Sequence, residues 1–319
     1  MAAESLGVRS MCTLVETPDI TVLLDAGVSV APYRFSLLPH PIEFQTLARL
    51  RRSIEEAAGR AEVVTISHYH FDHHTPSYED WLANWTEATE SARRIYQDKL
   101  VIMKNPKDKI NPSQRERAWM FQKTGGRLAK GLSVADGREF VFGGTVMRFS
   151  EAVSHGPEDA FLGWVVMASI ECSGECFMHA PDVQGPMSAR AMEIVLAEKP
   201  DVLMVGGPPF YLSGFKVDEG QIQKGLSNLV KIVETVPITM LEHHALRDAH
   251  WREKAELVLS ASEKAGHLLV TGAEYVGAKN TFLESRRKEL YAEFPPSVEF
   301  ERWAKIDSSK LSHSKPPIE

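Results

Sequence analysis

The residues best suited to chemistry gather in one stretch of the chain, Ser67-His68-Tyr69-His70-Phe71-Asp72-His73-His74. His68 and His70 lie two residues apart, so on an extended chain both side chains point the same way and can hold one ion together. If a helix begins after them, Asp72 and His73 lie in its first turn and can face a neighbouring position. Neutral imidazoles combined with carboxylates suit zinc, and also iron or manganese. The stretch therefore predicts a metal site.

Three other segments place a histidine or an aspartate just after an apolar strand. These residues are His155 after 145–149, Asp182 after 176–178, and the pair His243 and His244 at the end of 238–241. A lone histidine in such a place is more often structural than a ligand. Three such strand ends, in a chain that already contains the first cluster, favour convergence on a site for two metal ions.

The ordered set of these motifs resembles the metallo-β-lactamase-fold hydrolase superfamily. The set consists of His68-x-His70-x-Asp72-His73, His155, Asp182, and His243 or His244. Asp25, in Leu23-Leu24-Asp25-Ala26-Gly27, matches the first motif of that superfamily. The likeness covers residues 8 to 275, and the segments after Asp182 and His243 are similar to a mainly archaeal branch.

The resemblance implies a role for each of these residues. His68, His70 and His155 would hold the first ion; Asp72, His73 and a C-terminal histidine would hold the second; Asp182 would bridge the two. His243 is preferred over His244 as the last ligand, because Arg247 follows it by four residues, as in nuclease-like relatives. Asp25 would brace the metal-binding loops without binding an ion. Asp72 and Asp182 are the expected catalytic carboxylates, and Asp72 could steer a water molecule or accept its proton.

Other polar residues near the motifs have no place in this pattern. We expect His179 to be a packed strand residue and His74 to be a solvated residue in the first turn of a helix. Cys172 and Cys176 flank a Ser-Gly-Glu turn and could face one another across a hairpin. A disulfide there is the less favoured alternative to two free thiols, and neither alternative makes the cysteines catalytic.

The elements that must position the motifs follow a mixed α/β pattern. Strands are expected at 8–16, 20–24, 63–66, 140–149, 163–171, 176–178, 202–205, 238–241 and 268–271. Helices are expected at 41–60, around 81–100, and at 188–198, 221–234, 251–265 and 282–293. This order fits sheets covered by helices. The resemblance is more specific, since it implies a four-layer αββα sandwich of two mixed β-sheets flanked by helices.

The 319 residues are expected to form a single metallo-β-lactamase-like domain, residues 1–319, with a helical and locally basic insertion near 77–131. Residues 99–130 contain nine lysines and arginines against two acidic residues, in a chain of net charge −7. A basic segment beside a metal site could recruit a phosphate-bearing substrate. A solvated surface or an oligomer contact is an equal alternative, and the sequence leaves the oligomeric state open.

The overall composition excludes several classes of protein. A chain that is 43% hydrophobic and 25% charged is neither disordered nor a polycationic nucleic-acid binder. The longest strongly apolar run, 161–170, is half the roughly 20 residues that a membrane-spanning helix needs. The N-terminus also lacks the basic start and apolar stretch of a secretory signal. We therefore expect a cytoplasmic protein without a membrane partner.

The chemistry that follows from the motifs is hydrolysis. Two divalent cations, most readily zinc, lie about 3.5–4 Å apart in such sites and lower the pKa of a shared water, so that hydroxide becomes the nucleophile. We expect a phosphoester or phosphodiester substrate, either a small molecule or a nucleic acid. A carbonyl-centred hydrolase, such as a lactonase or thioesterase, is the alternative. A non-catalytic binding module and oxygen chemistry at a di-iron site are less favoured.

Overall fold

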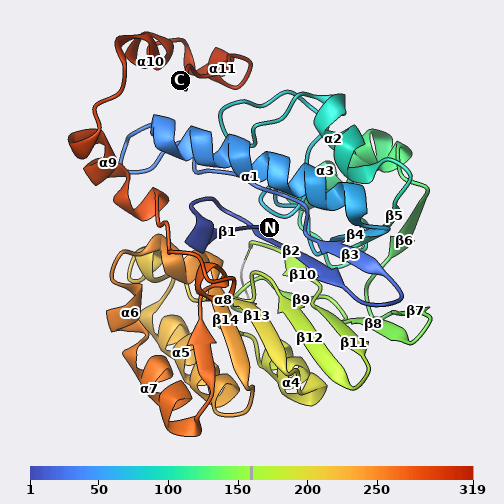
Figure 1. Cartoon of the computed structure of the whole chain (residues 1–319). Helices are drawn as coiled ribbons and strands as arrows, with labels where there is room; N and C mark the ends of the chain where they lie inside the picture. The colour runs from blue at the N-terminus through green and yellow to red at the C-terminus, as the bar shows by residue number, and fades with distance from the viewer. Residues whose placement is uncertain (159–160, 319) are drawn as a thin grey trace.

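Two mixed β-sheets lie face to face in the computed structural model, which describes residues 1–158 and 161–318. Helices cover the outer face of each sheet (Figure 1). On one side they are α1 (Pro41–Arg60), α2 (Thr89–Tyr96) and α3 (Pro112–Lys123), and on the other α4 (Ala189–Glu198), α5 (Glu219–Val233) and α7 (Glu256–Ala265). The four-layer αββα fold that the resemblance implied is therefore confirmed.

The first sheet has six strands in the order β1-β2-β3-β4-β5-β6. Their bounds are β1 Ala2–Ala3, β2 Met11–Glu16, β3 Thr21–Leu24, β4 Val63–Ile66, β5 Leu100–Met103 and β6 Gly131–Val134. The strands from β1 to β3 pair antiparallel, and those from β3 to β6 pair parallel. The carboxyl ends of β3 and β4 therefore meet at one edge of the sheet, which is where open α/β sheets place their sites.

The second sheet has seven strands in the order β15-β14-β13-β12-β11-β8-β7. Their bounds are β7 Glu139–Phe142, β8 Thr145–Phe149, β11 Ala168–Cys172, β12 Glu175–Ala180, β13 Val202–Gly206, β14 Ile238–Glu242 and β15 Leu268–Val270. The strands from β12 to β15 pair parallel. A separate two-stranded ladder joins β9 (Val153–Ser154) to β10 (Trp164–Val165). The carboxyl ends of β12 and β14 thus also share one edge.

Helix α1 (Pro41–Arg60) shows how the sequence fixes the outer layers. His40 caps it by accepting a hydrogen bond from the Ile42 N–H, and the Glu43 carboxylate accepts one from the His40 N–H. This is a capping box followed by proline at the first helical position. The apolar face of α1, which includes Phe44 and Leu47, packs into the core cluster of the first sheet.

The remaining helices connect or cover the strands. The α-helices are α2 Thr89–Tyr96, α3 Pro112–Lys123, α4 Ala189–Glu198, α5 Glu219–Val233, α6 Trp251–Lys254, α7 Glu256–Ala265, α8 Gly272–Tyr275, α9 Arg287–Glu293, α10 Val298–Trp303 and α11 Ser308–Leu311. The 3-10 helices are η1 Glu4–Leu6, η2 Gly125–Arg127, η3 Phe210–Leu212, η4 His243–Arg247 and η5 Glu284–Arg286. The C-terminal helices pass over α1, where Phe300 and Trp303 contact Phe44 (Figure 1). None of the helices that the structure describes is long and apolar enough to cross a bilayer.

Apolar side chains from both sheets fill the space between them. Val22 of β3, Ile102 of β5, and Met147 and Phe149 of β8 belong to one buried cluster. Fully burying one such side chain contributes about 1.5–3 kcal/mol. Because this layer is apolar, the polar residues of the site are confined to the strand ends.

The segment 77–131 differs from the insertion expected from the sequence. Leu100–Met103 forms β5, which pairs with both β4 and β6 inside the first sheet, so it is not part of a helical insertion. The helix expected around 81–100 is limited to Thr89–Tyr96. Four apolar residues after a helix are too few for periodicity to separate a strand from a helix end. The assignment of residues 1–319 to a single domain stays a prediction.

The two cysteines of the β11–β12 hairpin are free thiols. The hairpin expected from the sequence is present, but its register pairs Cys172 with Glu175 and Cys176 with Glu171. The cysteines therefore do not face one another, and the alternative of a disulfide is wrong. Burial raises the pKa of the Cys176 thiol to about 11.

Candidate metal centre

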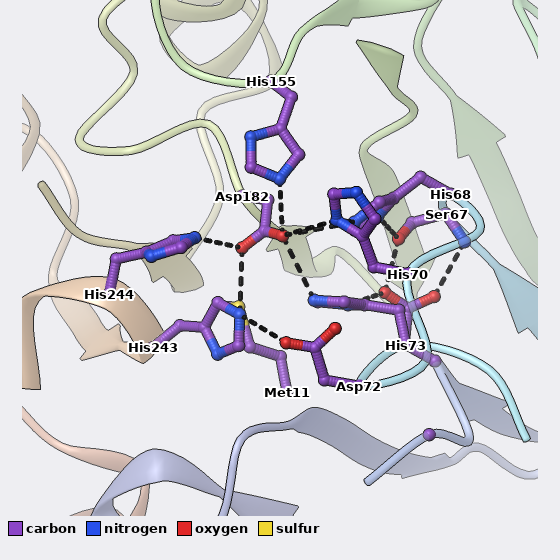
Figure 2. A network of polar contacts seen from close by, with 12 residues as sticks. Met11, Ser67, His68, His70, Asp72, His73, His155, Asp182, His243 and His244 are labelled. Carbon is purple, nitrogen blue, oxygen red and sulfur yellow. Dashed lines mark hydrogen bonds and ion pairs between the residues drawn. The ribbon is translucent and has the colours of Figure 1, made fainter. Parts of the chain in front are cut away.

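Strand ends from both sheets bring the sequence-predicted residues to one place (Figure 2). The segment after β4 supplies His68, His70, Asp72 and His73, the β9 ladder supplies His155, β12 supplies Asp182, and β14 supplies His243 and His244. These eight residues form overlapping groups in which the candidate ligand atoms of each group lie within 4.8 Å of one another. Residues up to 176 positions apart, from His68 to His244, thus share one centre.

Asp182 lies in the middle of the cluster. Its Oδ2 atom faces four imidazoles, at 2.8 Å from Nε2 of His155, 3.2 Å from Nε2 of His68, 3.3 Å from Nε2 of His73 and 3.9 Å from Nδ1 of His70. Its Oδ1 atom faces the other two, at 3.2 Å from Nε2 of His243 and 3.5 Å from Nε2 of His244. The two oxygens of one carboxylate therefore face two different groups of donors, as a bridging ligand would.

The electrostatics of the cluster favour ionised carboxylates. Burial would raise the pKa of Asp182, but His243, His155 and His73 hold it well below its usual range. Burial acts on Asp72 in the same direction, and the hydrogen bond from His243 again holds the pKa well below normal. Burial lowers the pKa of His68 well below its ordinary value, and the neighbouring imidazoles lower it further. Ionised carboxylates and neutral imidazoles are the forms that bind cations.

His73 is the exception among the imidazoles. Burial would lower its pKa, but the charges of Asp182 and Asp72 and the hydrogen bond to Asp25 raise it well above the ordinary value. The concentrated negative charge that would attract a cation therefore attracts a proton at this ring.

Two buried atoms of the cluster have no hydrogen-bond partner among the described residues. They are Oδ1 of Asp182 and Nε2 of His73, and both point into the centre (Figure 2). Buried polar atoms are nearly always paired, so an unpaired oxygen and an unpaired ring nitrogen here require an explanation. Metal coordination would satisfy both. Imidazole and carboxylate donors in this number fit two divalent ions such as zinc, iron or manganese.

Asp25, at the end of β3, fixes the segment that follows β4. Its Oδ1 accepts a hydrogen bond from the Ser67 N–H (2.8 Å), and its Oδ2 accepts from the Ser67 hydroxyl (2.5 Å) and from Nδ1 of His73 (2.8 Å). With a proton held on Nδ1, Nε2 beside Asp182 is the ring atom that would be left to bind a cation. Through these contacts Asp25 holds Ser67 and His73 in place, and its bracing of a metal site stays a prediction.

Gly27 allows the end of β3 to approach the metal-binding segment. A Cβ atom at this position would lie 2.3 Å from the backbone nitrogen of His74. Because that neighbour is backbone rather than a flexible side chain, any other residue would push the segment away. The glycine is therefore needed for the close approach of the two chains.

The metal-binding segment forms a single turn and not the start of a helix. The N–H groups of His73 and His74 both donate to the His70 carbonyl, at 3.0 and 3.2 Å, and the turn does not continue.

The expectation that His74 is solvated is wrong: it is buried, its ring packs against Phe71, and burial lowers its pKa to about 3. His179 is the packed strand residue that we expected, since it is buried with Nε2 3.0 Å from the Met11 carbonyl.

Three residues of the centre have left-handed backbone conformations. The φ angles are +50° for Asp25, +51° for Asp182 and +65° for His243. Aspartate, asparagine and histidine tolerate this region better than most side chains, although it still carries a cost. The sharp reversal directly after a strand turns each of these side chains into the centre.

Arg247 and Glu4 form a buried ion pair beside the centre that the motifs did not reveal. Nε of Arg247 donates to Oε2 of Glu4 at 2.9 Å, and both side chains are nearly inaccessible to solvent. The same guanidinium lies 3.2 Å from Nδ1 of His244, 3.3 Å from the Tyr211 hydroxyl and 3.6 Å from Oδ2 of Asp72. In the sequence, only the four-residue spacing from His243 indicated that Arg247 belongs near the site. Nothing in the sequence around Glu4 indicated the same for Glu4.

The contacts of the two C-terminal histidines favour His243 as the metal ligand. Nε2 of His243 faces two carboxylates, at 3.2 Å from Asp182 and 3.3 Å from Asp72. Nε2 of His244 faces only Asp182, while its Nδ1 lies 3.1 Å from the Tyr211 hydroxyl.

We expect His243→Ala to reduce the metal content from two ions to one and His244→Ala to leave two ions bound. Plasma emission spectrometry of the purified variants measures both values. His250→Ala, which removes an exposed histidine of the same region, is the matched control. Loss of an ion in His244→Ala alone would reverse the assignment.

The arrangement of strands and ligands defines a class of protein. Two facing mixed sheets, with the H-x-H-x-D-H segment after one parallel strand and the remaining ligands at the strand ends of the other sheet, make this a metallo-β-lactamase-fold protein. No protein-family model matches the chain.

The chain belongs to the UPF0282 family. It is 42% identical over 290 residues to a UPF0282 protein of Methanopyrus kandleri, an alignment that covers 91% of this chain and 97% of the relative. It is 43% identical over 292 residues to a UPF0282 protein of Thermococcus gammatolerans, covering 91% and 93%. These relatives are archaeal, as the resemblance to a mainly archaeal branch predicted.

Several solved structures show a distant likeness. One is the metallo-beta-lactamase fold protein YhfI from Bacillus subtilis, with a TM-score of 0.48 and 14% identity over 82% of this chain and 87% of that one. Another is the short form of human tRNase Z, with a TM-score of 0.42 and 12% identity over 75% and 90%. Because both scores are low, the fold assignment rests on the strand order and ligand positions of the chain itself.

Proposed function

We propose that this protein is a hydrolase with two divalent metal ions, most readily zinc, and that it cleaves phosphoesters or phosphodiesters. The observation that carries the proposal is the central position of Asp182, whose carboxylate lies 2.8 Å from His155 and 3.2 Å from His68, and also 3.3 Å from His73 and 3.2 Å from His243. Iron or manganese would fit the same donors. A cytoplasmic location, and a substrate that is a small phosphate-bearing molecule or a nucleic acid, are part of the proposal.

Each candidate ligand would have a particular role in such a site. His68, His70 and His155 would hold one ion; Asp72, His73 and His243 would hold the other; Asp182 would contact both. When bound, the ions would supply an activated water and positive charge for the transition state. Asp72 is 15% exposed, so it can reach substrate and accept a proton from an attacking water.

Buried and partly buried cations of the chain support a phosphate-bearing substrate. Arg247 keeps a permanent positive charge beside Asp72. The basic segment contributes less than its composition suggests, because Lys104 is buried against Asp136 (2.7 Å) and Lys109 lies 3.7 Å from Glu151. Arg117 of the same segment lies beside the metal-binding turn, where Nη1 donates to the Tyr69 carbonyl at 3.4 Å.

Parallel assays of the metal-loaded protein test this function. The substrates are bis(4-nitrophenyl) phosphate, 4-nitrophenyl phosphate, a γ-lactone and an acyl thioester, each with zinc, manganese or iron. We expect turnover of a phosphate ester that a chelator removes and added metal restores. Turnover of the lactone or thioester alone would establish the carbonyl-centred alternative. Two bound ions without hydrolysis of any ester would contradict the proposal and favour a binding module.

A further inference from the structure

A cavity of about 270 Å³ lies beside the metal centre, between the turn after β4 and helix α3. Its walls include Phe71, His74 and Tyr78 from the turn side, and Arg117 and Phe121 from α3. An apolar cavity of about 150 Å³ is large enough for benzene. The volume therefore suits an aromatic ring together with a polar substituent.

The cavity and the metal centre share one stretch of backbone. His70, Asp72 and His73 turn toward Asp182, whereas Phe71 and His74 line the cavity. The cavity side of the stretch is aromatic: the Phe71 ring centroid lies 5.2 Å from that of His74 and 5.5 Å from that of Tyr78. A group in this cavity would therefore lie directly across the turn from the candidate metal ligands.

Helix α3 is fixed over both sites by its first turns. Asn111 caps the helix through the Gln114 N–H (2.8 Å), and its side-chain amide donates to the Phe161 carbonyl (2.9 Å). The Gln114 amide donates to the Leu162 carbonyl at 2.8 Å, in the segment that follows His155. Arg117 and Phe121 follow Gln114 by three and seven residues, so all three lie on one face of the helix.

Arg117 places a positive charge at the wall of this cavity. Its guanidinium carbon lies 4.6 Å from the centroid of the Phe71 ring, a cation–π arrangement. In the described residues, no acidic side chain forms an ion pair with Arg117, although Glu116 also lines the cavity. Lys104 and Lys109 of the same segment are instead paired with acids. Arg117 is thus a cation that lines the cavity and is available to an anionic ligand there.

We propose that the cavity is a separate binding site for an aromatic anion, in which the walls take an aromatic or heteroaromatic ring and Arg117 binds a phosphate or similar group next to it. None of the candidate metal ligands lines the cavity, so this inference goes beyond the proposed function and does not depend on it. Edge-to-face contacts with Phe71 and Tyr78 recognise a ring, and the guanidinium recognises phosphate oxygens. An aliphatic ester would leave the aromatic walls without a partner.

Binding of phenylphosphonate and methylphosphonate to the zinc-loaded protein tests the cavity. Both compounds carry the same charged group, neither contains an ester to hydrolyse, and only the first has a ring. Calorimetry should give a Kd for phenylphosphonate that is at least about tenfold lower, since burial of one ring exceeds the 1.4 kcal/mol that a factor of ten requires. Tyr78→Ala should reduce that ratio to below about threefold, and Arg117→Ala should weaken both compounds by a similar factor.

Two residues of α3 outside the cavity provide matched controls. Trp119→Ala removes an exposed ring and Arg115→Ala removes an exposed guanidinium, and neither side chain lines the cavity. Both variants should bind like the wild type, and thermal unfolding of all four checks that they fold. A wild-type ratio near one, or equal losses in Tyr78→Ala and Trp119→Ala, would overturn the proposal.

The outcome also separates this inference from the proposed function. Hydrolysis of alkyl and aryl phosphate esters at similar rates, together with a binding ratio near one, would reject the cavity and keep the hydrolase. Ring-dependent binding without hydrolysis of any ester would keep the cavity as a ligand site and reject the proposed function.

Discussion

Asp182→Asn is expected to reduce the metal content from two ions to one or none and to lower turnover of a phosphate ester by at least about 100-fold, because metal-ion catalysis supplies several kcal/mol of transition-state stabilisation. The amide nitrogen would replace one of the two oxygens that face the imidazoles of His155 and His243. Metal analysis and steady-state kinetics on the same sample measure both effects.

Asparagine is a better replacement than alanine at this position. Asp182 has a φ of +51°, which asparagine tolerates and alanine does not, so the change removes a ligand without adding backbone strain. Asp201→Asn, in the loop before β13, removes a carboxylate far from the motifs and should leave both readouts unchanged. Full turnover by Asp182→Asn with two ions bound would end the two-metal hypothesis.

Arg287→Ala is expected to lower the free energy of unfolding by about 3–5 kcal/mol, the range for breaking a buried ion pair. The Arg287 guanidinium is buried and donates twice to the Glu43 carboxylate, at 2.8 Å each, and also to the carbonyls of Leu37 and Ala31. Removing it would leave the buried Glu43 carboxylate without a neutralising cation and would take a donor from both carbonyls. Urea unfolding followed by tryptophan fluorescence measures the loss.

The neighbouring Arg286 provides the comparison for this prediction. It is 53% exposed and lies 3.5 Å from Glu293, so Arg286→Ala should cost less than about 1 kcal/mol. Similar losses in the two variants would show that the ion pair of α9 with α1 does not stabilise the fold. Glu43 also completes the capping box of α1, so the Arg287 contact links the C-terminal region to the start of that helix.

The sequence predicted helices and strands most accurately where several local features indicated the same boundaries. Helix α1 has the bounds 41–60 that we expected, because a proline, a capping residue and helical apolar spacing all indicate the same start. Strand β4 also has its expected bounds, 63–66. Strand β5 was missed, since its pairing with β4 and β6 is a long-range property that four apolar residues do not encode.

The convergence of the candidate ligands was predictable, because their side chains suit a metal ion and their order along the chain is characteristic. What the sequence could not show is packing. His74 occupies the same turn as the ligands, yet its burial against Phe71 depends on α3, which lies some forty residues further along the chain. The pairing of Glu4 with Arg247 likewise joins segments that are far apart in the sequence, and no local pattern indicates this pairing.

The left-handed backbone at Asp25, Asp182 and His243 has a consequence for the history of the family. A residue at one of these positions must meet two requirements: its side chain must suit the metal site, and its backbone must tolerate the left-handed conformation. Few residue types meet both. A relative that had lost its catalytic activity would no longer need a side chain that suits the metal site, but it would still need a residue that tolerates the left-handed conformation. We expect such a pseudoenzyme to carry asparagine or glycine there, a substitution signature by which inactive lineages could be recognised from genomes alone.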